Sequence, residues 1–153
     1  MVKKIIHDPV FLSKKSVDAT EADKQVVTDL LDTLKANLDR CVGMAANMIG
    51  IHKNIIVVAV GPFQFVMINP VILEKSGEQT GDEGCLSLPG KAGQVTRPNH
   101  VKAKFYDLDM NEWEVEGEGL MARCICHELD HLDGHMYTEK VEGGLHDVNY
   151  EEP

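Results

Sequence analysis

The stretch CICHELDHLDG at residues 124–134 places two histidines four positions apart in an apolar run, with a glutamate directly after the first. An α-helix turns by about 100° per residue, so His127 and His131 project from nearly the same face, about one turn apart. Two neutral imidazoles with this spacing can bind one metal ion, and the Glu128 carboxylate beside them can take a proton from water on the metal. The stretch therefore predicts a helix that carries a hydrolytic metal site.

This helix is predicted over about residues 118–132, and Gly134 marks its end. Much of its surface away from the two histidines is apolar and is covered by Met121, Ile125, Leu129 and Leu132. Such a helix is expected to be largely buried, and buried imidazole or carboxylate groups are costly unless they are paired or bound to metal. A solvated surface helix is the alternative interpretation, because HExxH also occurs by chance.

Upstream of this helix, the pattern changes from helical to extended. Thr20 and Asp23 resemble the start of a helix, and apolar residues then recur with helical spacing to give a predicted helix over residues 21–39. Runs rich in apolar and β-branched residues predict strands at 54–60, 63–68, 71–74, 100–108 and 112–118. Asn69-Pro70 is expected to stop one strand, and residues 75–84 are interpreted as a loop. We therefore expect an α+β fold with antiparallel sheets around a C-terminal HExxH helix and with an N-terminal helix.

Length, composition and charge limit the class of protein. A chain of 153 residues is most simply one domain, 1–153, with a core large enough to need no disulfides. The opening MVKKIIHDPV has no signal segment, so the four cysteines are interpreted as reduced thiols or ligands in a cytoplasmic protein. No apolar run approaches the roughly 18 residues of a membrane span. A net charge of −10 also argues against nucleic acid as the main ligand.

A catalytic tetrahedral site needs a third protein ligand besides the two histidines. Metzincin peptidases extend the motif to HExxHxxGxxH, but here Tyr137 stands where the third histidine should be, and His135 lies two positions early. Gluzincin peptidases use a downstream glutamate, for which Glu151 and Glu152 are available in a polar terminal segment. Both alternatives are weaker than a ligand that lies upstream.

Cys85, in the stretch DEGCLSLPG, is the preferred third ligand. Gly84 lets the backbone approach closely, and a short strand after it would aim the sulfur and the following amide into one cleft. A lone cysteine is more often a small buried apolar residue, and this role is assigned to Cys41, Cys124 and Cys126.

The motifs EGCLS at 83–87 and HELDH at 127–131, behind GMAA at 43–46, together resemble those of peptide deformylases. The resemblance runs from the IIHDPV start to about residue 138. It implies removal of the formyl group from N-formylmethionine on a peptide or nascent bacterial chain. It also implies one divalent ion, with Fe(II) as the physiological metal and Zn, Ni or Co able to occupy the site.

The resemblance gives individual residues roles that their chemistry supports. The ion would be held by Cys85, His127 and His131. Glu128 would act as the general base and then as the acid toward the leaving amine. The backbone N–H of Leu86 would face the developing oxyanion, and Gly43 would line the substrate. Glu83 is a candidate outer partner of the site with Arg97, and an ordinary surface ion pair is the alternative.

The first motif departs from the family pattern GφGφAAxQ, in which the glutamine amide donates to the oxyanion. The chain has CVGMAANM, so Gly43 matches, whereas Cys41 replaces the first glycine and Met48 replaces the glutamine. A thioether cannot donate a hydrogen bond, and losing one oxyanion donor typically lowers turnover by about 10²–10³-fold. Asn47, one position early, has the right amide but would point differently if the segment is helical. Asn47 and Met48 are the candidate substrate-binding residues of this motif, with Gly43. Reduced deformylase activity is therefore expected.

The end of the chain also departs from the longer members of the family, which continue into another helix. The segment VEGGLHDVNYEEP has no apolar periodicity, so residues 139–153 are predicted to be a mobile tail. Two other functions stay open: a deformylase-like amidase for another N-acyl substrate, and a catalytically weak relic that binds metal and peptide.

Overall fold

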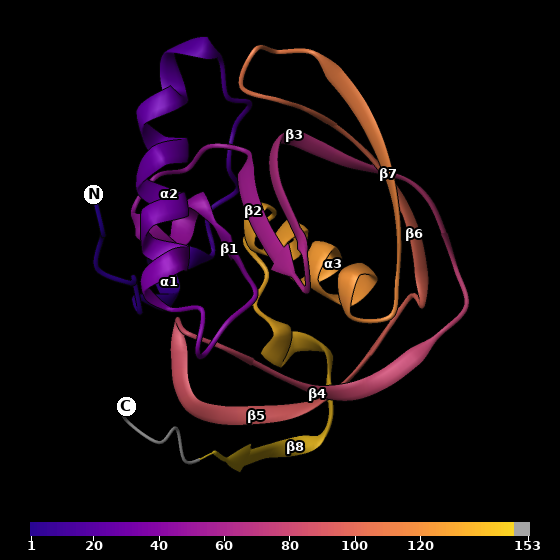
Figure 1. The fold of residues 1–153 in the computed structure, drawn as a ribbon. Helices are drawn as coiled ribbons and strands as arrows, with labels where there is room; N and C mark the ends of the chain where they lie inside the picture. Colours follow the sequence, from indigo (N-terminus) through magenta and orange to yellow (C-terminus); the bar gives the residue numbers. More distant parts are fainter. Residues whose placement is uncertain (149–153) are drawn as a thin grey trace.

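The computed structural model describes residues 1–148, and Figure 1 shows how their helices and strands are arranged. The α-helices and 3₁₀-helices are α1 (Pro9–Leu12), η1 (Glu21–Asp23), α2 (Lys24–Ala36), η2 (Ala46–Ile49), α3 (Leu120–Leu132) and η3 (Tyr137–Lys140). The strands are β1 (Gly43–Ala45), β2 (Ile55–Val60), β3 (Phe63–Ser76), β4 (Gln79–Cys85), β5 (Leu88–Arg97), β6 (His100–Tyr106), β7 (Glu112–Glu118) and β8 (Val141–Asp147). No helix among these residues has the length and apolar character needed to cross a membrane.

The strands form two antiparallel sheets around the last helix. One sheet has the order β1-β2-β3-β6-β7, and the other has the order β4-β5-β8. Helix α3 contacts β1, β2 and β7 of the first sheet and β5 of the second, and Figure 1 shows it in the middle of the molecule. The predicted α+β fold is confirmed, because the HExxH helix is surrounded by antiparallel strands and α2 lies near the N-terminus.

The N-terminal helix forms where the sequence predicts it, but it ends earlier. Thr20 accepts a hydrogen bond from the N–H of Ala22 at 3.3 Å, and the Asp23 carboxylate accepts one from the N–H of Thr20 at 2.9 Å. This capping box satisfies amides of the first turn, which is a 3₁₀ turn. The helix ends at Ala36. The side-chain amide of Asn37 donates to the Thr33 carbonyl at 2.7 Å and so takes the place of the backbone N–H that would continue the helix.

Two predictions about β3 and β4 are wrong. Asn69-Pro70 does not end a strand, because β3 continues through it with a change of register between Ile68 and Val71. Asn69 adopts a φ of 50°, and its side-chain amide bonds to both backbone groups of Ala19 at 2.8 and 3.0 Å. The predicted loop at 75–84 is instead the end of β3, a short turn and most of β4.

The C-terminal segment also differs from its prediction. A mobile tail is expected over residues 139–153, but the structure places Val141–Asp147 in β8, antiparallel to β5. The side chain of Val141 packs on Gly93, where a Cβ would lie 2.6 Å from a Val141 methyl carbon. An exposed edge strand needs little apolar periodicity, which explains why the sequence pattern missed it. Residues 149–153 of the predicted tail lie outside the described residues.

Candidate metal centre

Three side chains predicted as ligands meet at one point. The Cys85 sulfur at the end of β4 and one ring nitrogen each from His127 and His131 on α3 lie within 4.8 Å of one another. The Cys85 Sγ is 3.3 Å from the His131 Nε2. The three residues are 7%, 8% and 1% exposed, respectively. Helical spacing aligns the histidines and the strand end delivers the thiol, so the arrangement can hold a metal ion.

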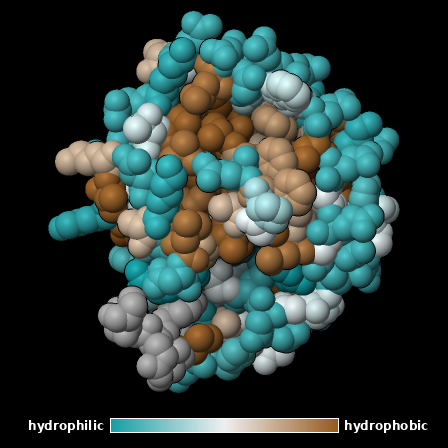
Figure 2. All heavy atoms as spheres, in the orientation of Figure 1, coloured by the Kyte–Doolittle hydropathy of each residue, from teal (hydrophilic) through white to brown (hydrophobic). Residues whose placement is uncertain are grey.

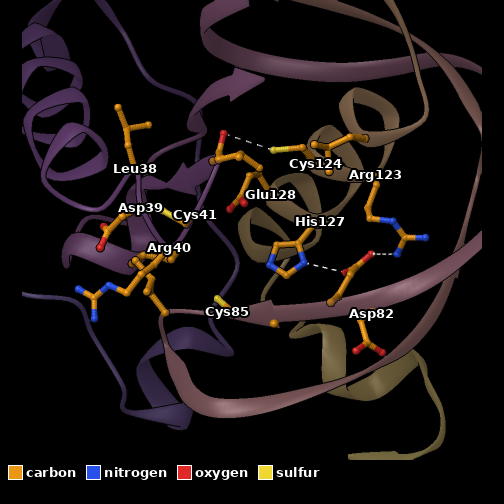
Figure 3. A pocket seen from close by; sticks show the side chains of 17 residues that line it. Leu38, Asp39, Arg40, Cys41, Asp82, Cys85, Arg123, Cys124, His127 and Glu128 are labelled. Atoms are coloured by element: carbon orange, nitrogen blue, oxygen red, sulfur yellow. Dashed lines mark hydrogen bonds and ion pairs between the residues drawn. The ribbon is translucent and has the colours of Figure 1, made fainter. Parts of the chain in front are cut away.

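A buried carboxylate fixes the orientation of His127. The Nδ1 of His127 donates to the Glu83 Oε1 at 2.8 Å, and this leaves the Nε2 lone pair of His127 facing Cys85 (Figure 3). Arg97 donates to the same carboxylate from Nε at 3.0 Å and from Nη2 at 2.9 Å. Burial alone would raise the pKa of Glu83, but the hydrogen bonds from His127 and Arg97 lower it to about 2. Because Glu83 and Arg97 are both buried, they are not an ordinary surface ion pair.

Burial acts differently on the two histidines. The pKa of His131 is lowered to about 3, first by desolvation and then by the charge of His127, so the ring is neutral and can bind metal. Desolvation also lowers the pKa of His127, but the Glu128 charge and the hydrogen bonds with Cys85 and Glu83 outweigh it and raise that pKa. A proton therefore competes with metal for His127.

Glu128 has the properties of a general acid or base. The residue is buried beside the three ligands, and its Oε1 has no hydrogen-bond partner among the described residues. Desolvation is the main cause that raises its pKa to about 7. A carboxyl group whose pKa lies near neutrality can both accept and return a proton, so Glu128 is placed and tuned for that task.

The cluster opens into a cavity of about 310 Å³. Its walls are the segment from Leu38 to Gly43 and the end of β4, and its floor is α3 (Figure 3). Figure 2 shows that apolar side chains gather at the centre of this face, within a more polar surround. Cys41 replaces the family glycine in the wall, and burial raises the pKa of its thiol to about 12. The wall at Cys41 is therefore neutral.

The other predicted site residues divide into two groups. Gly43, Met48 and Leu86 line the cavity, whereas Asn47 does not. The Asn47 side-chain amide instead donates to the His131 carbonyl at 2.8 Å, in a fully buried position. The structure thus turns Asn47 toward the helix and away from the cavity, which argues against the substrate-binding role predicted for it.

The metzincin alternative finds no support in the geometry. His135 is exposed, and its Nδ1 lies 3.2 Å from the Glu139 carboxylate, away from the cluster. Tyr137 is buried and stacks on the His127 ring with centroids 5.9 Å apart. The gluzincin candidates at 151 and 152 lie outside the described residues.

Sequence reasoning missed two residues that support the site. Arg123 donates to the Glu83 Oε2, and it also donates to the Val95 carbonyl at 3.2 Å. It is therefore a second cation, besides Arg97, that contacts the Glu83 carboxylate. Tyr137 stacks on His127 and bonds to the Lys91 carbonyl at 3.2 Å. The only signal for Arg123 is a charged residue on the apolar side of a helix, and Tyr137 has no local signal.

Gly43 packs so closely that replacement by alanine is expected to destabilise the protein by about 1–3 kcal/mol. A Cβ at this position would lie 2.6 Å from the Cys124 sulfur and 3.2 Å from the Glu128 Oε2. Thermal unfolding of Gly43→Ala measures the effect. Adding Cys124→Ala should recover much of the lost stability, with Cys124→Ala alone as the control, and no recovery would mean that another contact causes the strain.

Comparisons with known proteins agree on one family. The family model for polypeptide deformylase matches residues 2–145. The peptide deformylase of Agathobacter rectalis is 62% identical over 149 residues, which cover 95% of this chain and 92% of the relative. That of Lachnoclostridium phytofermentans is 51% identical over 144 residues, which cover 92% of this chain and 87% of the relative. The crystal structure of the Thermotoga maritima peptide deformylase matches with a TM-score of 0.86 at 30% identity, over 93% of this chain and 99% of that one.

Proposed function

This chain belongs to the polypeptide deformylase family, and from that premise we propose that it removes the formyl group from N-formylmethionyl peptides or nascent chains. The family makes it an amide hydrolase. The observation that carries the substrate proposal is the cluster of Cys85, His127 and His131 with the buried Glu128 beside it, which opens into a cavity of about 310 Å³. This arrangement combines a metal site and a proton carrier in one place.

The donor set fits one divalent ion. A thiolate with two imidazoles suits Fe(II), Zn, Ni or Co, and the resemblance favours Fe(II). Glu83 holds His127 in the tautomer that a ligand needs, and the lowered pKa keeps His131 neutral. When bound, such an ion would polarise the formyl carbonyl and lower the pKa of a water molecule.

The protein's own groups then move the protons and orient the substrate. Glu128, with a pKa of about 7, takes a proton from the attacking water and returns it to the amine nitrogen that leaves. The backbone N–H of Leu86, directly after Cys85 in the cavity wall, would donate to the oxygen that gains charge. Met48 brings a thioether to the same cavity and adds no donor.

Met48→Gln is expected to raise kcat by up to about 10²-fold, with little change in KM. The Met48 sulfur lies 3.5 Å from the backbone nitrogen of Ala45, which donates to it. A glutamine carbonyl oxygen could accept from the same N–H and leave its amide facing the cavity. Steady-state kinetics on a formyl-methionyl peptide test this. Met48→Leu, which fills the space without a donor, is the control and should show no gain.

A neutral or harmful Met48→Gln would favour the alternative that the cavity serves another acyl group. Cys41 and Met48 are the two wall residues that depart from the family pattern, so they are where such a change would be built. An amidase of this kind would cleave an acetyl peptide better than the formyl peptide. A relic would bind the formyl peptide equally well in the wild type and in Glu128→Gln, and neither would release product.

Formate release from formyl-Met-Ala-Ser tests the proposed function directly. The full chain is prepared without oxygen and loaded with Fe(II), because thiolate-bound iron could be lost by oxidation and make an active enzyme look inactive. Acetyl-Met-Ala-Ser is the matched substrate. We expect formate from the first peptide and far slower release of acetate from the second. Equal rates, or no formate at any enzyme concentration, would contradict the proposal.

A further inference from the structure

Asn47 is the polar residue of the segment AANM, and the proposed reaction does not use its side chain. It lies in η2, is fully buried, and donates from its Nδ2 to the His131 carbonyl at 2.8 Å. Burying an amide is costly unless its polar atoms find partners, so a buried asparagine is usually held by specific bonds. Here the bond spans 84 positions of the chain and ends on the helix turn that carries a candidate metal ligand.

The last turn of α3 depends on partners outside the helix. The last carbonyls of a helix have no N–H group four residues further along. His131 is the last residue but one of α3, and its carbonyl accepts from the Gly134 N–H at 3.0 Å as well as from Asn47. The next carbonyl, that of Leu132, accepts from the Ser16 N–H at 2.8 Å. The turn that carries His131 is therefore fastened to the N-terminal half of the chain.

The backbone around Asn47 is itself fixed. The Ile6 N–H donates to the Met48 carbonyl at 2.8 Å, and the Gly50 N–H donates to the Asn47 carbonyl at 3.2 Å. Gly50 has a φ of 95°, a left-handed conformation that ends η2. Ala46, Asn47 and Met48 are all buried. Asn47 is thus a rigid anchor, and the last turn of α3 is what it holds in place.

The ring of His131 needs a hydrogen-bond partner on the side away from the other candidate ligands. Its Nε2 faces the Cys85 Sγ at 3.3 Å, so this nitrogen is the one that can bind metal. A neutral imidazole that binds metal through Nε2 carries its proton on Nδ1, which usually donates to a fixed acceptor. The His131 Nδ1 and the Asn47 Oδ1 are both buried, and neither has a hydrogen-bond partner within residues 1–148. One unpaired donor and one unpaired acceptor therefore lie on two residues that are already bonded to each other.

We propose that Asn47 is the positioning residue of His131. Its Nδ2 holds the carbonyl of the turn that carries this ligand, and its Oδ1 accepts from one water molecule that in turn accepts from the Nδ1–H. Asn47 thus does for His131 what Glu83 does for His127, with a neutral amide in place of a carboxylate. Loss of such a partner typically weakens metal binding by about 10–100-fold. The inference rests on the metal site of the proposed function and is independent of its substrate.

Asn47→Leu in the full chain tests the inference, because it removes both polar atoms and fills nearly the same space. The Zn(II) dissociation constant, measured by competition with a chromophoric chelator, should rise about 10–100-fold, and Zn(II) should leave the protein faster. KM for formyl-Met-Ala-Ser should stay unchanged at full metal occupancy, because Asn47 does not line the cavity. An unchanged Zn(II) dissociation constant in the folded variant would overturn the inference.

Asn37→Leu is the matched control. Asn37 is also a buried asparagine, and its Nδ2 donates to the Thr33 carbonyl at 2.7 Å near the end of α2, a helix without a candidate ligand. Thermal unfolding should show that both variants lose stability, whereas only Asn47→Leu should lose affinity for Zn(II). An equal loss of affinity in both variants would make general destabilisation the cause and would overturn the inference.

The visible absorption of the Co(II)-loaded protein gives a second readout, because it reports the geometry of the ligands. The bands should change in Asn47→Leu and stay as in the wild type in Asn37→Leu. Identical spectra in all three proteins would contradict a positioning role. If thermal unfolding shows that Asn47→Leu is not folded, Asn47→Ala takes its place in every measurement, with Asn37→Ala as its control.

The metal measurements use no peptide, so they distinguish failure of the inference from failure of the proposed function. Weaker Zn(II) binding in Asn47→Leu, with no formate from any peptide, would support the inference while the proposed substrate is wrong. A lower kcat at full metal occupancy, with an unchanged Zn(II) dissociation constant, would assign Asn47 to the substrate and overturn the inference alone. A wild type that binds no divalent ion would overturn both the metal site and the role of Asn47.

Discussion

Glu128→Gln is expected to lower kcat for formate release by about 10²–10⁴-fold, while the protein keeps its metal and its affinity for the peptide. Glutamine has nearly the same shape as glutamate but cannot accept or return a proton at neutral pH. Burial raises the pKa of Glu128 to about 7, which suits both taking a proton and returning it. The candidate metal ligands among the described residues are Cys85, His127 and His131, and Glu128 is not one of them. The loss should therefore appear in turnover and not in binding.

Steady-state kinetics, elemental analysis and a peptide-binding titration on the same preparation check each part of this expectation. Glu78→Gln is the matched control, because Glu78 is exposed between β3 and β4 and should behave as wild type. Metal loss in Glu128→Gln would make this carboxylate a ligand. Unchanged turnover would remove it from the mechanism and would require another base.

Local sequence patterns were sufficient for the parts of the site that lie on one element. The spacing of His127 and His131 fixes their common face as soon as the segment is a helix, and the apolar surroundings predict its burial. Cys85 is different, because it lies far away in the chain and reaches the histidines only through the path of β4. Its candidacy came from its neighbours in DEGCLSLPG and was then reinforced by the joint resemblance of two motifs, and periodicity alone would not have found it.

Strands whose side chains are polar explain most of what the sequence did not predict. Residues 75–84 look like a loop because their charged side chains are taken as solvated, yet Glu83 is buried within an ion-pair network with Arg97 and Arg123. The partners of that network come from β5 and α3, so only the folded chain brings them together. Strand β8 was not predicted because it is an exposed edge strand, so its sequence lacks the apolar pattern of a buried strand.

Position by itself could not decide between Asn47 and Met48 either. Both stand near the place of the family glutamine, and only the backbone of η2 determines which side chain faces the cavity. Asn47 points to the His131 carbonyl and Met48 to the cavity wall. The side chain with the useful amide is thus the one that is turned away, which is why Met48→Gln is the informative change.

Cys85→Ala and His131→Ala are each expected to lose the bound metal. Each change leaves two of the three ligand atoms that now lie within 4.8 Å, and two protein ligands do not complete a tetrahedral catalytic site. Metal that binds the native state stabilises it by about 2.7 kcal/mol when its free concentration is about 100 times Kd. The wild type should show that gain in thermal unfolding, and both variants should show almost none.

Two matched variants separate the loss of a ligand from the loss of any cysteine or histidine. Cys126 is a free thiol on the same helix outside the cluster, and His135 is an exposed imidazole just beyond it, so Cys126→Ala and His135→Ala should retain about one ion per chain. Elemental analysis of all four variants and the wild type gives the occupancy. A fully occupied ion in both Cys85→Ala and His131→Ala would refute the ligand assignment. Metal retained in Cys85→Ala alone, with His131→Ala empty, would mean that the histidine pair recruits a different third ligand, as in a zincin peptidase.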